Sequence, residues 1–180
     1  AVSAANVGIS LLSPAIPQLR DDLMVTSDEA QLVLSAFLIM LGVGQLIAGS
    51  LSDRIGRRPV LVYGSLLFLL SGLGALFSTS IEMLVAMRIF QGLGAATCMA
   101  MGRVIISDSF QRAEAGRQMS TITMFQSVVP LLGFAFGGVM ADLVGWRGSV
   151  GLMVVTAAMV FLGTSFLLAE SRDPSIKPVP

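Results

Sequence analysis

The sequence predicts an all-α membrane protein with six transmembrane helices. Its mean hydropathy is +0.85, and only 12% of its 180 residues are charged, whereas an average soluble domain has about 25%. Six apolar runs each approach the roughly 20 residues that a helix needs to cross about 30 Å of hydrocarbon. These runs are too long for barrel strands, and lipid offers backbone groups no partners, so helices are expected.

The apolar runs cover residues 1–19, 30–52, 59–81, 83–107, 118–141 and 148–169. Only the fourth run contains charged residues, Arg88 and Arg103. The first run begins without a methionine or a basic leader and contains Pro14 and Pro17, which favours a truncated first helix over a cleaved signal peptide. Residues 1–169 are therefore expected to form one six-helix bundle.

Basic residues are concentrated on one side of the predicted membrane. The opposite side carries only Arg20 and Arg147. The positive-inside rule then places both ends of the chain in the cytoplasm. The basic residues on that side are Arg54, Arg57, Arg58, Arg112, Arg117, Arg172 and Lys177. The net charge of zero hides this asymmetry and gives no reason to expect a nucleic-acid partner.

The residue types that are missing exclude several enzyme classes. The sequence has no histidine, which excludes Ser-His and Cys-His catalysis and histidine metal sites, and its one cysteine, Cys98, lies in an apolar run. A water channel would carry paired Asn-Pro-Ala loops, and none is present. A transporter without metal or cofactor is therefore expected, with a non-transporting membrane scaffold as the alternative.

The second and fifth runs end in the same pattern, G-x3-D-x2-G-x-R. Its residues are Gly49, Asp53, Gly56 and Arg58 in one copy, and Gly138, Asp142, Gly145 and Arg147 in the other. One copy falls on the cytoplasmic side of the membrane and the other on the outer side, as a two-fold axis in the membrane plane would place them. The sequence therefore predicts two inverted three-helix repeats, an arrangement typical of transporters.

The stretch G-S-L-S-D-R-I-G-R-R after the second run resembles a motif of the major facilitator superfamily, G-x-L-x-D-R-x-G-R-R. It matches at Gly49, Leu51, Asp53, Arg54, Gly56, Arg57 and Arg58. The resemblance implies a conformational latch at the cytoplasmic face, in which Arg57 links Asp53 to the acid that closes the fourth span, Asp108. Asp53 and Arg57 are then not expected to contact the substrate.

The fourth run carries a second resemblance to this superfamily. L-V-A-M-R-I-F-Q-G-L-G-A-A, from Leu84, is similar to its fourth-span motif, and S-P-A-I-P at 13–17 adds a proline-rich first span. Together they indicate the twelve-span drug:proton antiporter branch, of the bicyclomycin-resistance type. The chain would then be the amino-terminal half of the fold, with the carboxyl-terminal half missing and 170–180 starting the central cytoplasmic linker.

The fifth run departs from that branch. Where antiporters usually carry G-P-x-x-G-G, this chain has G-F-A-F-G-G, with Phe134 at the proline position and Pro130 one turn earlier as a substitute kink. Exchange, as opposed to symport, is therefore less well supported than the fold. Small residues favour close helix packing, and the expected packing residues are Gly92, Gly133, Gly137 and Gly138.

Two arginines within one span indicate a polar cavity, because a central arginine avoids lipid. Arg88 and Arg103 fall within about 60° of one another on one helix face, and family resemblance links Arg88 to proton coupling. The alternative for Arg103 is a side chain that snorkels to the cytoplasmic surface. The other expected coupling or cavity residues are Asn6, Gln91, Met99, Met124 and Gln126.

These features together predict a secondary transporter of the bacterial inner membrane that exports small, amphipathic or cationic drugs by alternating access with proton antiport. A metabolite or sugar carrier of the same superfamily is the alternative. No Asp or Glu lies inside any run. The protonation site is therefore expected in the missing half, in the lost start of the first span, or nowhere.

Overall fold

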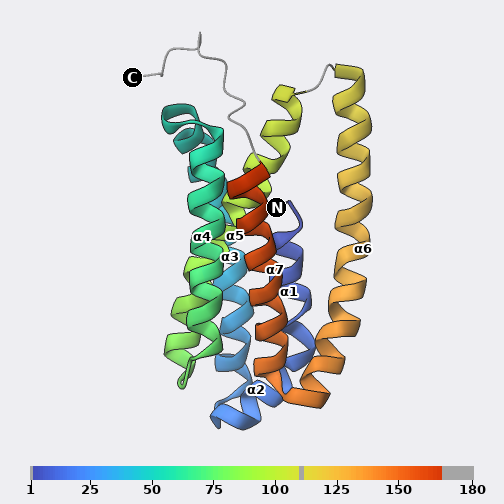
Figure 1. Ribbon diagram of the computed structural model, residues 1–180. Coiled ribbons are helices and arrows are strands. Elements are labelled where there is room, and N and C mark those ends of the chain that lie inside the picture. Colours follow the sequence, from blue (N-terminus) through green and yellow to red (C-terminus); the bar gives the residue numbers. More distant parts are fainter. Residues whose placement is uncertain (1, 110–111, 168–180) are drawn as a thin grey trace.

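The computed structural model describes residues 2–109 and 112–167, and this part of the chain is helical without strands (Figure 1). Its elements are α1 (Ala4–Ser10), the 3₁₀ turn η1 (Ser13–Ala15), α2 (Ile16–Leu23), α3 (Ser27–Ile55), α4 (Arg57–Leu76), α5 (Ile81–Ser109), α6 (Arg112–Val144) and α7 (Trp146–Leu167). The predicted linker at 170–180 lies outside the described residues.

Five helices, α3 to α7, are long and apolar enough to cross a membrane, and they correspond to the second to sixth predicted spans. The first span differs from the expected single helix. It breaks into α1, η1 and α2, and Pro14 lies in the turn that separates the two helices. Proline has no backbone N–H to continue the ladder, so a break at this position follows from the sequence.

The ends of the long helices lie beyond the apolar runs. Helix α3 begins at Ser27, where Thr26 and Glu29 form a capping box, and ends at Ile55. Helix α6 begins at Arg112, before the apolar run at 118–141. Polar residues can continue a helix outside the hydrocarbon, so hydropathy predicts the membrane-spanning part and misses these extra turns.

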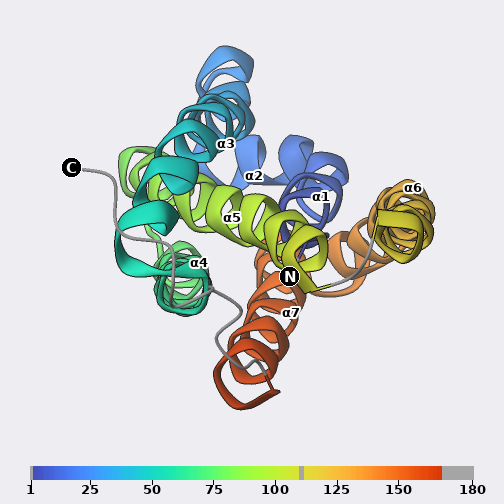
Figure 2. The same ribbon diagram turned by 90° about the horizontal axis from the view of Figure 1, so that it is seen from above.

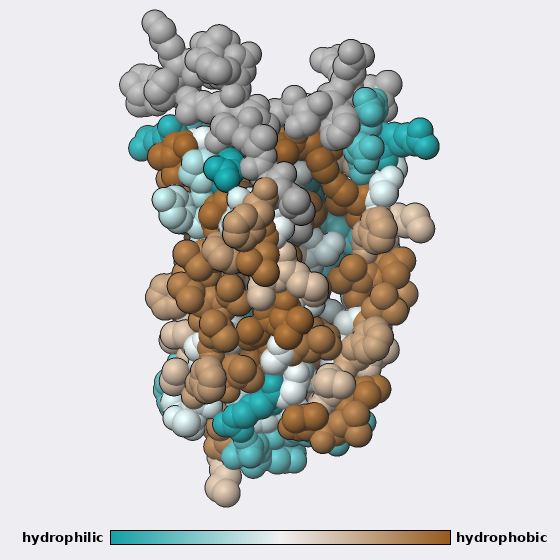
Figure 3. Space-filling view, viewed as in Figure 1, coloured by the Kyte–Doolittle hydropathy of each residue, from teal (hydrophilic) through white to brown (hydrophobic). Residues whose placement is uncertain are grey.

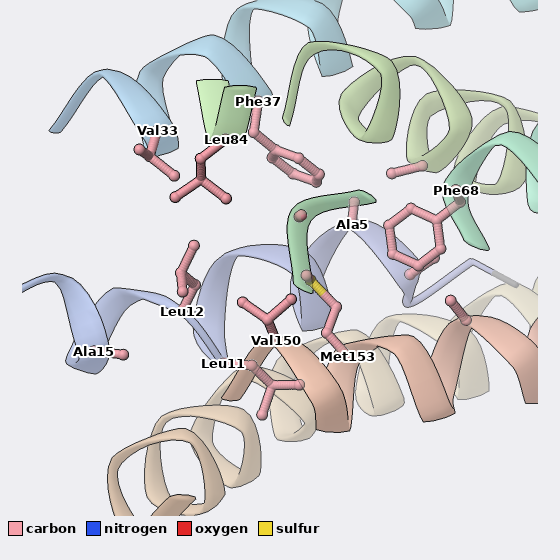
Figure 4. Packing of buried hydrophobic residues seen from close by; sticks show 14 of the residues in the cluster. Ala5, Leu11, Leu12, Ala15, Val33, Phe37, Phe68, Leu84, Val150 and Met153 are labelled. Atoms are coloured by element: carbon pink, nitrogen blue, oxygen red, sulfur yellow. The ribbon is translucent and has the colours of Figure 1, made fainter. Parts of the chain in front are cut away.

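Helix α5 occupies the centre of the bundle, with α3 on one side and α4 on the other (Figure 2). Glycines permit this contact. A Cβ added at Gly92 would lie 2.5 Å from the carbonyl oxygen of Phe37, and one at Gly94 would lie 2.6 Å from the backbone nitrogen of Phe68. Side chains of α1, α3, α4, α5 and α7 complete the buried cluster in Figure 4.

The outer surface suits a membrane. Apolar residues cover the middle of the face in Figure 3, and hydrophilic residues gather at its two ends. Figure 1 shows α6 lying apart from the bundle in its first half and curving toward α1 in the half that follows Pro130. Phe134 is exposed there.

Two adjacent glycines of α6 provide a packing test. A Cβ at Gly137 would collide with the backbone of Leu11, which follows α1, whereas a Cβ at Gly138 would meet only Pro14 Cβ at 3.9 Å. Gly137→Ala is therefore expected to destabilise the full-length protein by about 1–3 kcal/mol, as overpacking does. Gly138→Ala serves as the matched control and should leave the melting temperature unchanged. Equal melting temperatures for the two variants would contradict this packing.

Candidate transport site

The copy of the repeated pattern at 49–58, which is predicted to face the cytoplasm and is called the inner copy, forms the sharp turn between α3 and α4. Gly56 alone connects these helices and has φ = 102°, a value that L side chains rarely adopt, so glycine is required. Its N–H donates to the carbonyl of Ser52 at 3.0 Å and closes α3. The turn brings Arg57 back over the last turn of α3, where its Nη1 donates to Asp53 Oδ1 at 2.7 Å.

The ion pair between Asp53 and Arg57 is therefore present, as the latch motif implies. Arg57 also donates to the hydroxyl of Ser52 at 3.4 Å, and its side chain is 19% exposed, against 59% for Asp53. Leu51 and Arg54 are exposed, and nothing lies within 4 Å of a Cβ placed at Gly49. The side chain of Asp108 lies outside the described residues, so its link to Arg57 remains a prediction.

The outer copy makes a different set of contacts, although its turn is the same. Gly145 alone joins α6 to α7, has φ = 82°, and donates its N–H to the carbonyl of Ala141 at 2.8 Å. However, Asp142 and Arg147 do not pair with each other. Asp142 accepts a long contact of 3.5 Å from Gln18 of α2, and Arg147 Nη1 donates to Asp22 of α2 at 2.8 Å.

Asp22 is the centre of an outer cluster that joins three parts of the chain. Its Oδ2 also accepts a 2.8 Å hydrogen bond from the buried indole of Trp146, and Arg147 stacks 4.3 Å from that ring. The indole bond, followed by the bond from Arg147, holds the pKa of Asp22 below its ordinary value. Arg147 Nη2 donates to the carbonyl of Ser78 in the α4–α5 connection at 3.1 Å. The cluster therefore fastens α2, α7 and this connection.

Arg88 lies fully buried at the centre of the bundle, where four elements meet. Its Nη2 donates to the carbonyl of Gly8 at 2.6 Å, and its Nε donates to the carbonyl of Val33 at 3.4 Å. The guanidinium also lies 4.5 Å from the centroid of the Phe37 ring. These contacts link α5 to α1 and α3.

Gln91 completes this network one helical turn from Arg88. Its Oε1 accepts a hydrogen bond of 2.7 Å from Arg88 Nη1, and the same nitrogen lies 3.5 Å from Met153 Sδ of α7. The Nε2 of Gln91 is buried without an acceptor among the described residues. Every described acceptor of Arg88 is neutral, so the structure holds a buried cation without a paired carboxylate, an expensive arrangement that is typical of functional sites in membranes.

Three predicted cavity residues meet at a second polar site. Asn6 of α1 donates to the backbone carbonyl of Gln126 in α6 at 3.0 Å, and Arg103 of α5 donates to the side-chain Oε1 of Gln126 at 3.4 Å. The amide of Gln126 in turn reaches the carbonyl of Val2 at 3.4 Å. Arg103 is exposed, so this site is open.

The predicted methionines do not join this site by any hydrogen bond of the described residues. Met99 is half-buried against the core, and Met124 is 68% exposed on α6. Beside α6 there is also an apolar pocket of ≈ 330 Å³, lined by Val7, Leu11, Val129, Leu132, Gly133, Phe136, Leu152 and Thr156.

A family model described as the Major Facilitator Superfamily matches residues 1–180. The chain belongs to this superfamily. The match confirms the resemblance to this superfamily that the two motifs carry.

Curated relatives of this major facilitator chain include drug-resistance proteins. It is 32% identical over 172 residues to a chloramphenicol resistance protein of Pseudomonas aeruginosa, covering 93% of this chain and 38% of the relative. It is also 32% identical over 171 residues to multidrug resistance protein D of Escherichia coli K12, covering 95% and 43%. The chain thus spans about two fifths of the length of these relatives, consistent with the predicted amino-terminal half.

Solved structures support the fold. The crystal structure of a D-xylose–proton symporter superposes with a TM-score of 0.78 at 18% identity, over 94% of this chain and 47% of the symporter. The six-span, all-helical fold prediction is confirmed at this level. The low identity means that the likeness concerns the fold alone.

Proposed function

We propose that this chain is the amino-terminal half of an exporter of small, amphipathic or cationic compounds, driven by proton antiport and alternating access. The observation that carries the proposal is the buried Arg88 network, in a chain whose curated relatives are drug-resistance proteins. The whole transporter then needs the carboxyl-terminal half, because two halves must move against each other around one site.

Arg88 is suited to proton coupling as a fixed positive charge. A cation within about 4–6 Å lowers the pKa of a carboxyl group by about 1–3 units, so an acid that approaches Arg88 releases its proton and one that moves away takes it up. The described residues place no carboxylate next to Arg88. The titrating acid in this proposal therefore comes from the other half or from the substrate.

The inner latch is proposed to favour the outward-open state, in which the two halves meet at the cytoplasmic face. This orientation rests on the basic residues near Gly56 and the positive-inside rule. We further propose that both ends of this chain lie in the cytoplasm and that the membrane is a bacterial inner membrane. The accessibility of cysteines introduced at positions 54 and 145 to an impermeant thiol reagent tests the orientation.

The polar site of Asn6, Arg103 and Gln126 is proposed to line the substrate path. In the full-length protein in proteoliposomes, a pH gradient is expected to drive transport of a cationic dye. Arg103→Ala should change the KM for the dye by about tenfold or alter which drugs are carried. Arg117→Ala, which removes another exposed arginine of the same end, is the control. Unaltered transport of every substrate by Arg103→Ala would assign this side chain to the membrane surface. Proton-driven sugar uptake without dye transport would favour the carrier alternative.

A further inference from the structure

A small pocket lies on the outside of the bundle, beside the turn at Gly56 and away from the polar sites at Arg88 and Arg103. It has a volume of ≈ 280 Å³ and lies between the first turns of α4 and the last turns of α7. Its lining residues are Arg58, Pro59, Val62, Tyr63 and Ser165. One cation, one phenol and one hydroxyl thus gather at a shallow site with apolar walls.

Arg58 spans the two helices. Its Nη2 donates to the carbonyl of Ser165 in the last turn of α7 at 3.1 Å, which fixes the guanidinium beside the pocket. A guanidinium has five N–H donors in a planar fork, so this one bond leaves donors for a ligand. No carboxylate pairs with Arg58 among the described residues.

Ser165 adds a second polar group to the pocket. Its Oγ is buried from solvent and has no hydrogen-bond partner in the part of the chain that the structure describes. Buried hydroxyls are usually hydrogen-bonded, so this atom is available for a ligand that brings an acceptor. A phosphate oxygen would satisfy both the hydroxyl and the guanidinium fork.

The surroundings of the pocket are those of a membrane boundary. Tyr63 is exposed about 7.5 Å deeper along α4 than Arg58, at the level where aromatic rings meet head groups. Deeper still, the face of α4 and α7 is apolar, as Figure 3 shows. Its exposed side chains are Leu70, Val155, Met159 and Leu162. A molecule with a phosphate and two acyl chains matches this order of polar and apolar surface.

We infer that this pocket binds the phosphate of an anionic phospholipid, with the acyl chains along α4 and α7. The end of the bundle that carries it is the one we propose to be cytoplasmic, where anionic lipids and basic pockets between helices meet. The site is separate from the polar site at Arg103, so its occupancy does not require transport.

The experiment measures the binding of phosphatidylglycerol to the purified full-length protein by native mass spectrometry, with phosphatidylcholine as the neutral comparison. Arg58→Ala is expected to weaken phosphatidylglycerol binding about fivefold, the effect of one arginine near a charged surface. Ser165→Ala should weaken it in the same direction, and Arg58→Lys should retain part of the affinity. Arg117→Ala, which removes an exposed arginine of α6 at the same end of the bundle, is the matched control.

Each result separates this site from general surface charge. Equal losses in Arg58→Ala and Arg117→Ala would overturn the inference in favour of nonspecific attraction, and wild-type binding by Arg58→Ala would overturn it outright. Competition by soluble glycerol phosphate at the same concentration as the lipid would assign the pocket to a free phosphate compound instead. None of these readings depends on drug export, so they remain informative if the proposed function fails.

Discussion

Replacing Arg88 by alanine in the full-length transporter is expected to abolish proton-coupled transport and to destabilise the protein by about 3 kcal/mol. The change leaves the carbonyls of Gly8 and Val33 and the Oε1 of Gln91 without their donor in an apolar interior. Each unpaired buried group costs about 1–3 kcal/mol, and removing a buried charge offsets part of that total. Thermal unfolding in detergent and dye transport in proteoliposomes measure the two effects.

Lysine at this position separates coupling from packing. Arg88→Lys keeps the charge, but a single ammonium cannot reproduce the planar fork that reaches both α1 and α3. We expect this variant to retain most of the thermal stability and to lose proton coupling, seen as a transport rate that no longer depends on the pH gradient. Wild-type coupling in Arg88→Met, which has no charge, would show that the arginine is only a structural link.

Much of the fold could be predicted because the length of an apolar run is enough to identify a membrane-spanning helix. An apolar run of about 20 residues is expected to be helical in lipid, because its backbone groups must bond to one another, so α3 to α7 follow from the sequence. The run at 1–19, which contains two prolines, is the exception and breaks into α1, η1 and α2. The burial of Arg88 follows from its position near the middle of a span, since an arginine there avoids lipid. Gly56 and Gly145, which occupy the same place in the repeated pattern, both form a turn between two helices with a positive φ.

The partners of these residues could not be predicted, because they depend on three-dimensional contacts. Arg88 binds the backbone carbonyls of Gly8 and Val33, and every residue has a carbonyl, so no side-chain pattern marks these two. The stacking of Phe37 on Arg88 was missed for the same reason. Trp146 could have been noticed, since it is the only tryptophan and stands next to Arg147, but its bond to Asp22 crosses 124 positions of sequence.

Two aspartates that pair with arginines at the two turns, Asp53 within the inner copy and Asp22 opposite Arg147 of the outer copy, are expected to respond differently to replacement by asparagine. At the inner copy, Asp53 pairs with Arg57 four residues away, within one repeat and at an exposed position. Exposed pairs contribute little to stability. A pair that differs between two conformers nevertheless biases their populations. Asp53→Asn should therefore leave the melting temperature unchanged and shift the full-length protein toward the inward-open state, measured by distances between spin labels.

At the outer copy, Asp22→Asn weakens a cluster that fastens α2 of the first repeat to α7 of the second and, through Arg147, to the α4–α5 connection. We expect a lower melting temperature with unchanged conformer populations, because both states need a rigid amino-terminal half. The pKa of Asp22 is lowered in the folded protein, so its stabilising effect is present above its ordinary value of 3.8 and is lost as the pH falls through the lowered pKa. The difference in melting temperature between wild type and Asp22→Asn should therefore shrink below about pH 4. A shift in populations by Asp22→Asn, or a loss of stability by Asp53→Asn, would mean that the outer and inner copies do not divide these roles.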